Sequence, residues 1–197
     1  MCKYRSMARI KDAPVEQYAP LYGDDAGEFH RVMAHRAPLE AGLAGFQHAL
    51  RTDRVLPDRL HELVRLRVAF WNQCRGCMAG RYQEAIDDGL TEELVCSLER
   101  PQEAEDLTPA ERAAIAYADL MATDHLAIGD ATFEGLREHF TEPEIVELAI
   151  NLAYLVGVGR LTASLEMLEG LPERFLEGER ATPWGDGEVM VLDRVTT

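Results

Sequence analysis

Two cysteines lie three residues apart in the segment Cys74-Arg75-Gly76-Cys77, the only closely spaced pair among the four cysteines of the chain. Two thiols at this spacing near the start of a helix are close enough to close a small ring, and the free N–H groups of a helix start stabilise a thiolate. Asn72 stands where it could cap such a helix. The pair therefore indicates a reversible dithiol.

Metal binding is the competing interpretation of two close cysteines. A structural zinc site needs four ligands, whereas no second pair occurs and Cys2 and Cys96 stand alone. The six histidines are scattered, form no metal-binding motif and are assigned to packing or to solvent: His30, His35, His48, His61, His125 and His139. We expect no metal and no cofactor, and an inert cysteine pair stays open as a third interpretation.

Glu62 and Arg81 are the charged residues that could serve this pair. Glu62 precedes Cys74 by 12 residues, which in one straight helix is a rise of about 18 Å and too far for contact. A chain reversal just before Cys74 would bring Arg81 alongside Glu62, and Arg81 is also four residues after Cys77, on the same helix face. We expect a line of Cys77, Arg81 and Glu62; an ordinary surface ion pair between the two charges is the alternative.

The rest of the chain is expected to be an all-α, single-domain helical bundle. Glycine and proline fall between periodic segments and alternation typical of strands is almost absent, so no strand is expected. Thr108-Pro109-Ala110-Glu111 carries the cap of a helix start. Apolar residues of segment 57–71 recur on one face that should meet the core, namely Leu60, Leu63, Val64, Val68 and Trp71. The expected helices span residues 15–22, 26–36, 38–52, 57–71, 74–88, 91–98, 108–123, 130–140 and 143–168.

Two regions in the C-terminal part of the chain are expected to pack against another element. Gly157 and Gly159 inside a helix indicate close contact with another helix. Residues 1–172 are expected to form the helical domain and residues 173–197 an arm or tail. The apolar run 189–192 in this tail needs covering, and a neighbouring subunit could cover it.

Composition excludes several classes of partner. The chain has 197 residues, 20 Lys and Arg against 35 Asp and Glu, and a formal charge of −15, which repels nucleic acid and anionic membranes. The longest uncharged run, residues 148–159, is shorter than the roughly 20 residues of a membrane span. No signal-peptide pattern is present, so we expect a cytoplasmic location, where cysteines need a role other than a structural disulfide.

At this point the residues resemble a known family. Glu62, eleven intervening residues, Cys74-x-x-Cys77 and, after three more residues, the polar Arg81 are similar to the signature of the alkylhydroperoxidase D-like branch of the carboxymuconolactone decarboxylase family. The resemblance covers about residues 30–168. It implies an all-helical oligomer built from dimers or trimers, with antioxidant, peroxiredoxin-type activity that reduces hydroperoxides with electrons from a thiol or dithiol reductant.

By this resemblance Cys77 is the cysteine that attacks peroxide, Cys74 the one that resolves, and Glu62 part of a proton relay. Arg81 stands where the family has a histidine, and because arginine cannot shuttle protons, we expect it to act by charge. Two other functions stay open. The other family branch decarboxylates a lactone and does not need two cysteines, and a non-enzymatic oligomer could simply respond to redox state.

Overall fold

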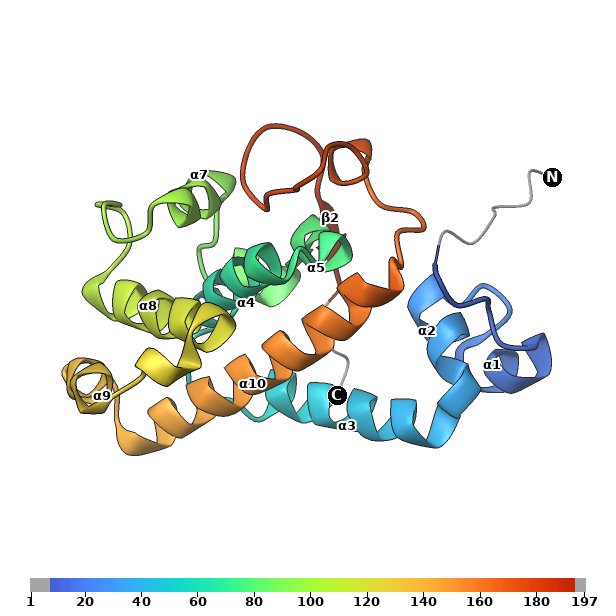
Figure 1. Ribbon diagram of the computed structural model, residues 1–197, viewed down its shortest axis with the longest axis horizontal. Helices are drawn as coiled ribbons and strands as arrows, with labels where there is room; N and C mark the ends of the chain where they lie inside the picture. The colour runs from blue at the N-terminus through green and yellow to red at the C-terminus, as the bar shows by residue number, and fades with distance from the viewer. Residues whose placement is uncertain (1–7, 194–197) are drawn as a thin grey trace.

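The computed structural model describes residues 8–193, so Cys2 and residues 194–197 of the expected tail lie outside the described residues. The central element is α4 (Asp58–Asn72), on which α8 (Pro109–Thr123) and α10 (Glu142–Leu165) pack. Figure 1 shows α10 running diagonally across the molecule. Four residues of the expected apolar face are at most 4% exposed, which confirms that this face meets the core: Leu60, Leu63, Val64 and Val68.

The other elements surround this three-helix centre. The remaining α-helices are α1 (Val15–Tyr22), α2 (Glu28–Met33), α3 (Ala37–Thr52), α5 (Arg75–Ala79), α6 (Gln83–Asp87), α7 (Glu92–Cys96) and α9 (Asp130–Arg137). Short 3-10 turns lie at Ala34–Arg36, Ser97–Glu99, His125–Ala127 and Glu173–Phe175, and the two strands are β1 (Gly80–Tyr82) and β2 (Met190–Leu192). The fold is therefore mostly helical, as the sequence predicts, and most helices lie close to the expected ranges.

Segment 74–88 is the main correction, because it is not one helix. It divides into α5, β1 and α6, and β1 pairs in parallel with β2, with Gly80 opposite Met190. The expectation of no strand is wrong here. A Cβ atom on Gly80 would lie 2.6 Å from Leu192 Cδ1, so a residue without a side chain lets the two strands approach.

The C-terminal segment, defined here as residues 173–193, packs on the helical part of the same chain. Phe175 and Ala181 join a small apolar cluster with Met78 and Ala79, beside the main core. Pairing of β2 with β1 covers part of the apolar run expected to need a neighbouring subunit, although Val191 stays 56% exposed. Residues 189–192 are therefore covered at least partly by β1 of the same chain.

Helix α10 is long and apolar enough to cross a membrane by length and composition alone, so the short uncharged run does not by itself exclude a span. In the structure it packs along α4 with Leu148 and Leu152 buried. Core helices of soluble proteins pass the same test, and one such helix is weak evidence for a membrane protein. The opposite face of α10 stays open to solvent and includes the apolar Val146, Ile150 and Leu161.

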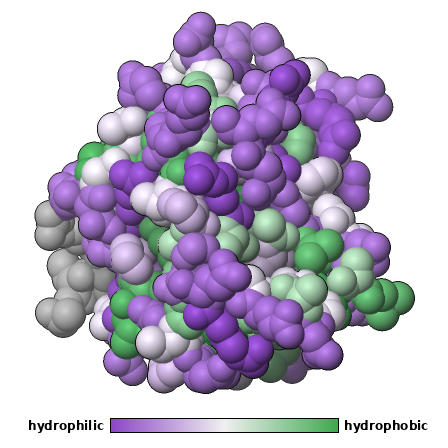
Figure 2. Space-filling view, turned by 90° about the vertical axis from the view of Figure 1, so that its left-hand side faces the viewer, coloured by the Kyte–Doolittle hydropathy of each residue, from purple (hydrophilic) through white to green (hydrophobic). Residues whose placement is uncertain are grey.

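The end of the molecule near α7, α8 and α9 is mostly hydrophilic on its surface (Figure 2). Its polar groups hold the turns between helices. Glu111 and Thr108 form the expected capping box at the start of α8, and Asp106 accepts a hydrogen bond from Ser97 at 2.7 Å. Such caps satisfy N–H groups that a helix start leaves free.

Two glycines of α10 have different surroundings. A Cβ atom on Gly159 would lie 2.4 Å from Asn72 Nδ2, whereas one on Gly157 would meet nothing within 4 Å. Asn72 is held there because its amide donates to Leu155 O at 3.0 Å. The expected close helix contact is therefore confirmed for Gly159 and wrong for Gly157.

This difference predicts opposite effects of one substitution at two positions of the same helix. Gly157→Ala should stabilise the chain by about 1 kcal/mol, since alanine favours helix and its Cβ would meet no atom of the same chain within 4 Å. Gly159→Ala should destabilise it by about 1 kcal/mol or more, because Asn72 must move and lose its hydrogen bond. Urea unfolding of both variants measures the two free energies, and equal stability of the variants would contradict the prediction.

Candidate functional site

The end of α4 sets the position of the cysteine pair. Gln73 adopts a left-handed backbone with φ of 51°, and Cys74 N–H donates to Ala69 O at 3.0 Å, so the helix stops and the chain turns as expected. A left-handed conformation is costly for a residue with a side chain. The side chain of Gln73 helps to hold the turn by donating to Phe70 O at 2.6 Å.

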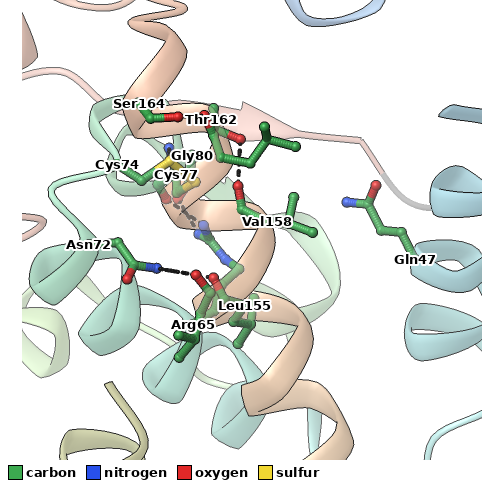
Figure 3. Close-up of a disulfide and its surroundings, with 12 residues drawn as sticks. Gln47, Arg65, Asn72, Cys74, Cys77, Gly80, Leu155, Val158, Thr162 and Ser164 are labelled. Carbon is green, nitrogen blue, oxygen red and sulfur yellow. Dashed lines mark hydrogen bonds between the residues drawn. A yellow bond between two sulfur atoms is a disulfide. The ribbon is translucent and has the colours of Figure 1, made fainter. Parts of the chain in front are cut away.

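Cys74 and Cys77 are joined by a disulfide, with their Cα atoms 5.2 Å apart (Figure 3). Cys74 itself, rather than Asn72, caps α5, and its Sγ accepts a hydrogen bond from Cys77 N–H at 3.3 Å. Cys74 is completely buried, whereas Cys77 is partly exposed. By whole-residue exposure, Cys77 is therefore the more open cysteine of the pair.

Glu62 is nearly fully buried on α4, and its partner is Arg65 rather than Arg81. Arg65 Nε and Nη2 each donate to one oxygen of Glu62 at 2.6 Å. The Glu62 oxygen bonded to Nη2 also accepts from Tyr82 N–H at 3.2 Å. Three N–H groups thus occupy the carboxylate.

Arg65 reaches from this pair to the cysteine segment. Its Nη1 donates to Cys77 O and its Nη2 to Gly80 O at 2.8 Å, and Figure 3 shows the side chain extending toward the disulfide. Burial lowers the pKa of Arg65, but attraction and hydrogen bonding to Glu62 outweigh it, and the pKa lies above its ordinary value. A fixed positive charge therefore lies beside the backbone of Cys77.

Arg81 does not form the expected line with Cys77 and Glu62. The helix that carries Cys77 ends at Ala79, so the four-residue spacing does not place the two side chains on one helix face. Arg81 instead forms a two-pronged ion pair with Glu92, at 2.8 and 3.1 Å, and donates to Pro183 O at 2.7 Å. Both geometric expectations for Arg81, contact with Glu62 and a shared helix face with Cys77, are wrong.

Sequence reasoning missed Arg65, although a signal was present. Glu62 and Arg65 are three residues apart on one helix, a spacing that brings opposite charges together. The family signature has its polar residue at position 81 and so points to Arg81 rather than to Arg65.

A cavity of about 50 Å³ lies beside Glu62 and Arg65, between α3, α4 and α10. Its polar lining includes Gln47, Tyr82 and Tyr154. Burial, together with the nearby Tyr82, raises the pKa of Tyr154 to about 12, so its phenol keeps its proton. This volume is enough for a few water molecules next to the Glu62 carboxylate.

His61 also lines this cavity, but its ring nitrogens are both occupied. Nε2 lies 2.7 Å from Glu147 Oε1 and Nδ1 lies 2.9 Å from Asn151 Nδ2. Glu147 also accepts from the backbone N–H groups of Val55 and Leu56. Burial, the largest cause, lowers the pKa of His61 despite the carboxylate. The packing role predicted for this histidine fits a neutral ring that joins α4 to α10.

Among the residues that the structure describes, no group of three or more His, Cys, Asp or Glu side chains could hold a metal ion. Cys96 is an exposed free cysteine. Of the four site residues predicted from sequence, the structure brings Cys74, Cys77 and Glu62 together through Arg65. The Arg81 guanidinium pairs with Glu92 and donates to Met78 O and Gly80 O, but it binds neither Glu62 nor Cys77 O.

Comparisons with known proteins relate this chain to one family and to one fold. Residues 25–120 match the model of the carboxymuconolactone decarboxylase family. Two uncharacterised proteins of Mycobacterium tuberculosis, from strains CDC 1551 / Oshkosh and ATCC 25618 / H37Rv, are each 36% identical over 121 residues. That match covers 60% of this chain and 42% of each relative, so the chain spans less than half of their length.

Two crystal structures share the fold. One is described as an alkylhydroperoxidase AhpD core, an uncharacterised peroxidase-related protein from Ralstonia eutropha JMP134; it is 18% identical with a TM-score of 0.65, over 87% of this chain and 95% of that one. An uncharacterised peroxidase-related protein from Silicibacter sp. TM1040 is 14% identical with a TM-score of 0.63, over 84% and 92%. Residues 25–120 thus resemble the carboxymuconolactone decarboxylase family, and the fold of the chain is that of the AhpD-like peroxidase-related proteins.

Proposed function

We propose that this protein is a dithiol peroxidase that reduces hydroperoxides through Cys77 and Cys74. The observation that carries the proposal is the Cys74–Cys77 disulfide, in which one cysteine is partly exposed and the other completely buried. This asymmetry suits a pair in which one sulfur meets the substrate and the other only meets its partner.

In the proposed reaction the reduced Cys77 thiolate attacks the terminal oxygen of the hydroperoxide. A sulfur–oxygen bond forms, the oxygen–oxygen bond breaks, and the alkoxide leaves as an alcohol after taking a proton. Cys74, as its thiolate, then attacks the sulfenic acid of Cys77, so that the disulfide forms and the oxygen leaves as water with one more proton. The peroxide is reduced by two electrons and the dithiol is oxidised by two.

An external thiol or dithiol then restores the pair. Because Cys74 is buried, the reductant attacks Cys77, and Cys74 leaves as the thiolate. The N–H of Cys77, 3.3 Å from Cys74 Sγ, is placed to stabilise this leaving group. A reducing compartment such as the cytoplasm would supply such a reductant.

We assign to Arg65 the electrostatic role that the sequence suggests for Arg81. Arg65 binds the carbonyl oxygen of Cys77 itself and is held there by Glu62. Since three N–H groups occupy Glu62, this carboxylate positions Arg65, and solvent at the partly exposed Cys77 supplies the proton for the leaving alkoxide. This route replaces the Glu62 relay implied by the resemblance.

The two alternatives have weaker support. A lactone decarboxylase, the activity that gives the family its name, has no need of the cysteine pair, and the occupied Glu62 has no oxygen free of protein donors for substrate. A non-enzymatic redox-responsive module needs the disulfide but not its asymmetric exposure. Turnover of peroxide distinguishes the peroxidase from both.

We also propose that the protein is a homo-oligomer that uses the open face of α10. Val146, Ile150 and Leu161 are between 37% and 55% exposed and recur along one side of the helix. Phe46 of α3, 44% exposed, extends this apolar surface, since its ring lies 5.5 Å from that of Tyr154 on α10. Contiguous apolar surface of this kind commonly marks an interface, and a second copy offers a matching one.

Replacement of each cysteine tests the proposed roles. Cys77→Ser should abolish peroxide consumption, because no accessible thiolate remains at the site. Cys74→Ser should allow one stoichiometric turnover and leave Cys77 as a sulfenic acid, detectable by mass spectrometry after dimedone labelling. Cys96→Ser is the matched control and should turn over as the wild type does. Full activity of Cys77→Ser, or a trapped sulfenic acid at Cys74 instead, would refute the assignment.

Arg65 and Arg81 form a matched pair for the electrostatic role. Arg65→Gln should slow alkylation of the reduced Cys77 thiol at pH 7 by about tenfold, because the nearby positive charge that favours the thiolate is lost. Arg81→Gln should slow this reaction less than Arg65→Gln does, since the Arg81 guanidinium pairs with Glu92 and donates to Met78 O and Gly80 O rather than to Cys77 O. The rate of Cys77 alkylation by iodoacetamide is measured by peptide mapping. A larger effect of Arg81→Gln than of Arg65→Gln would assign the electrostatic role to Arg81.

The oligomer can be tested by sedimentation of the wild type and two variants. The wild type should sediment as a multiple of the 22.0 kDa chain. Ile150→Glu should dissociate it, because a charge in the centre of the apolar face cannot be buried cheaply. Leu126→Glu, at a position that is 85% exposed and not part of the apolar face of α10, is the control and should not change the mass. A 22.0 kDa wild type contradicts the proposal.

A further inference from the structure

One of the two residues between the cysteines, Arg75, is bound to the C-terminal segment. Arg75 follows Cys74 directly, and its guanidinium donates to four backbone carbonyls of the C-terminal segment. The acceptors are Phe175 O at 2.8 Å, Glu177 O at 3.1 Å, Gly178 O at 2.6 Å and Glu179 O at 3.4 Å. One side chain of the redox motif therefore binds a continuous stretch of that segment.

Residues on both sides of the motif bind the same segment. Gln73 exchanges two hydrogen bonds with the backbone of Ala181, at 3.0 and 3.3 Å, and Arg81 donates to Pro183 O at 2.7 Å. Phe175, completely buried, packs in the same apolar cluster as Met78. The C-terminal segment is thus held largely by residues 73–82, the part of the chain that contains the disulfide.

We propose that the C-terminal segment is part of the redox site and that Arg75 is the positioning residue that couples its docking to the state of the cysteine pair. The inference goes beyond the proposed peroxidase activity, because it concerns only the interconversion of disulfide and dithiol. In that interconversion an external dithiol gives two electrons and two protons, the Cys74–Cys77 bond breaks, two thiols form, and the external dithiol becomes a disulfide.

The direction of the coupling follows from chain entropy. The disulfide holds the Cα atoms of Cys74 and Cys77 5.2 Å apart and so fixes the turn that presents Arg75. Reduction removes this constraint, so the turn at residues 74–77 gains conformational freedom. Docking of the C-terminal segment must then also order the turn, which costs conformational entropy. The segment consequently binds the disulfide form more tightly than the dithiol form. Because coupling is reciprocal, the docked segment stabilises the disulfide against reduction.

The first test measures the equilibrium of the full-length protein with mixtures of reduced and oxidised dithiothreitol. Peptide mapping gives the reduced fraction of the Cys74–Cys77 peptide. Arg75→Met should raise the equilibrium constant for reduction about tenfold, equivalent to ~30 mV for two electrons. Arg75→Lys, which keeps the charge but not the planar fork, should lie between this variant and the wild type.

Arg112 provides the matched control. It also holds a loop through backbone carbonyls, donating to Ala104 O at 2.7 Å and Leu107 O at 2.5 Å, and neither bond involves the cysteine segment or the C-terminal segment. Arg112→Met should lower stability without moving the equilibrium constant by more than twofold. If it moves the constant as far as Arg75→Met does, the effect is general destabilisation and the proposal is wrong.

The second test uses the reciprocal effect. Amide hydrogen exchange of residues 175–183 should become faster when the wild-type disulfide is reduced, and this acceleration should shrink in Arg75→Met, whose segment is already loosened. The proposal requires both effects. It is overturned if hydrogen exchange of residues 175–183 does not change on reduction, or if the equilibrium constant of Arg75→Met lies within twofold of the wild-type value. Peroxide enters neither test, so a failed peroxidase assay leaves the outcome intact.

Discussion

One buried guanidinium joins the two helices on which the cysteine site is built. Arg65 is bound on one side to both oxygens of Glu62 and on the other to the carbonyl oxygens of Cys77 and Gly80. A buried charge is tolerated only when its partners are complete, and loss of either side would leave the other uncompensated. A helix of five residues such as α5 has little stability of its own. The position of the cysteine pair is therefore determined by α4 through Arg65, and only secondarily by the short helix that contains it.

Much of the helical architecture could be predicted because it depends on local signals. Long helices show their apolar period and their caps, as α8 does with Thr108 and Glu111, and their ranges in the structure are close to those expected. Segment 74–88 could not be predicted in this way. Its two helices have five residues each, too few to show a period, and β1 exists because β2, more than a hundred residues later, pairs with it. The local sequence of β1 does not show that a distant segment will pair with it.

The candidate site could be predicted only in part. The residues Glu62, Cys74 and Cys77 do lie close together in the fold, whereas the predicted position of Arg81 assumed a helix that continues past Ala79. Once the chain leaves the helix, a spacing of four residues no longer implies a shared face. The charge that does reach the cysteines belongs to Arg65, whose spacing from Glu62 lies within one continuous helix. Spacing arguments are reliable inside an element and fail at its end.

Close packing of Gly159 against Asn72 constrains how this sequence can diverge. The amide of Asn72 fills the space that a side chain at position 159 would take, and it also donates to Leu155 O. Asn72 is the last residue of α4, two positions before Cys74. A larger residue at 159 would be accepted only together with a smaller one at 72, and that smaller residue would lose the tie to α10 next to the redox turn. Substitution at either position is conditional on the other, so relatives of this protein should carry the two residues as a covarying pair.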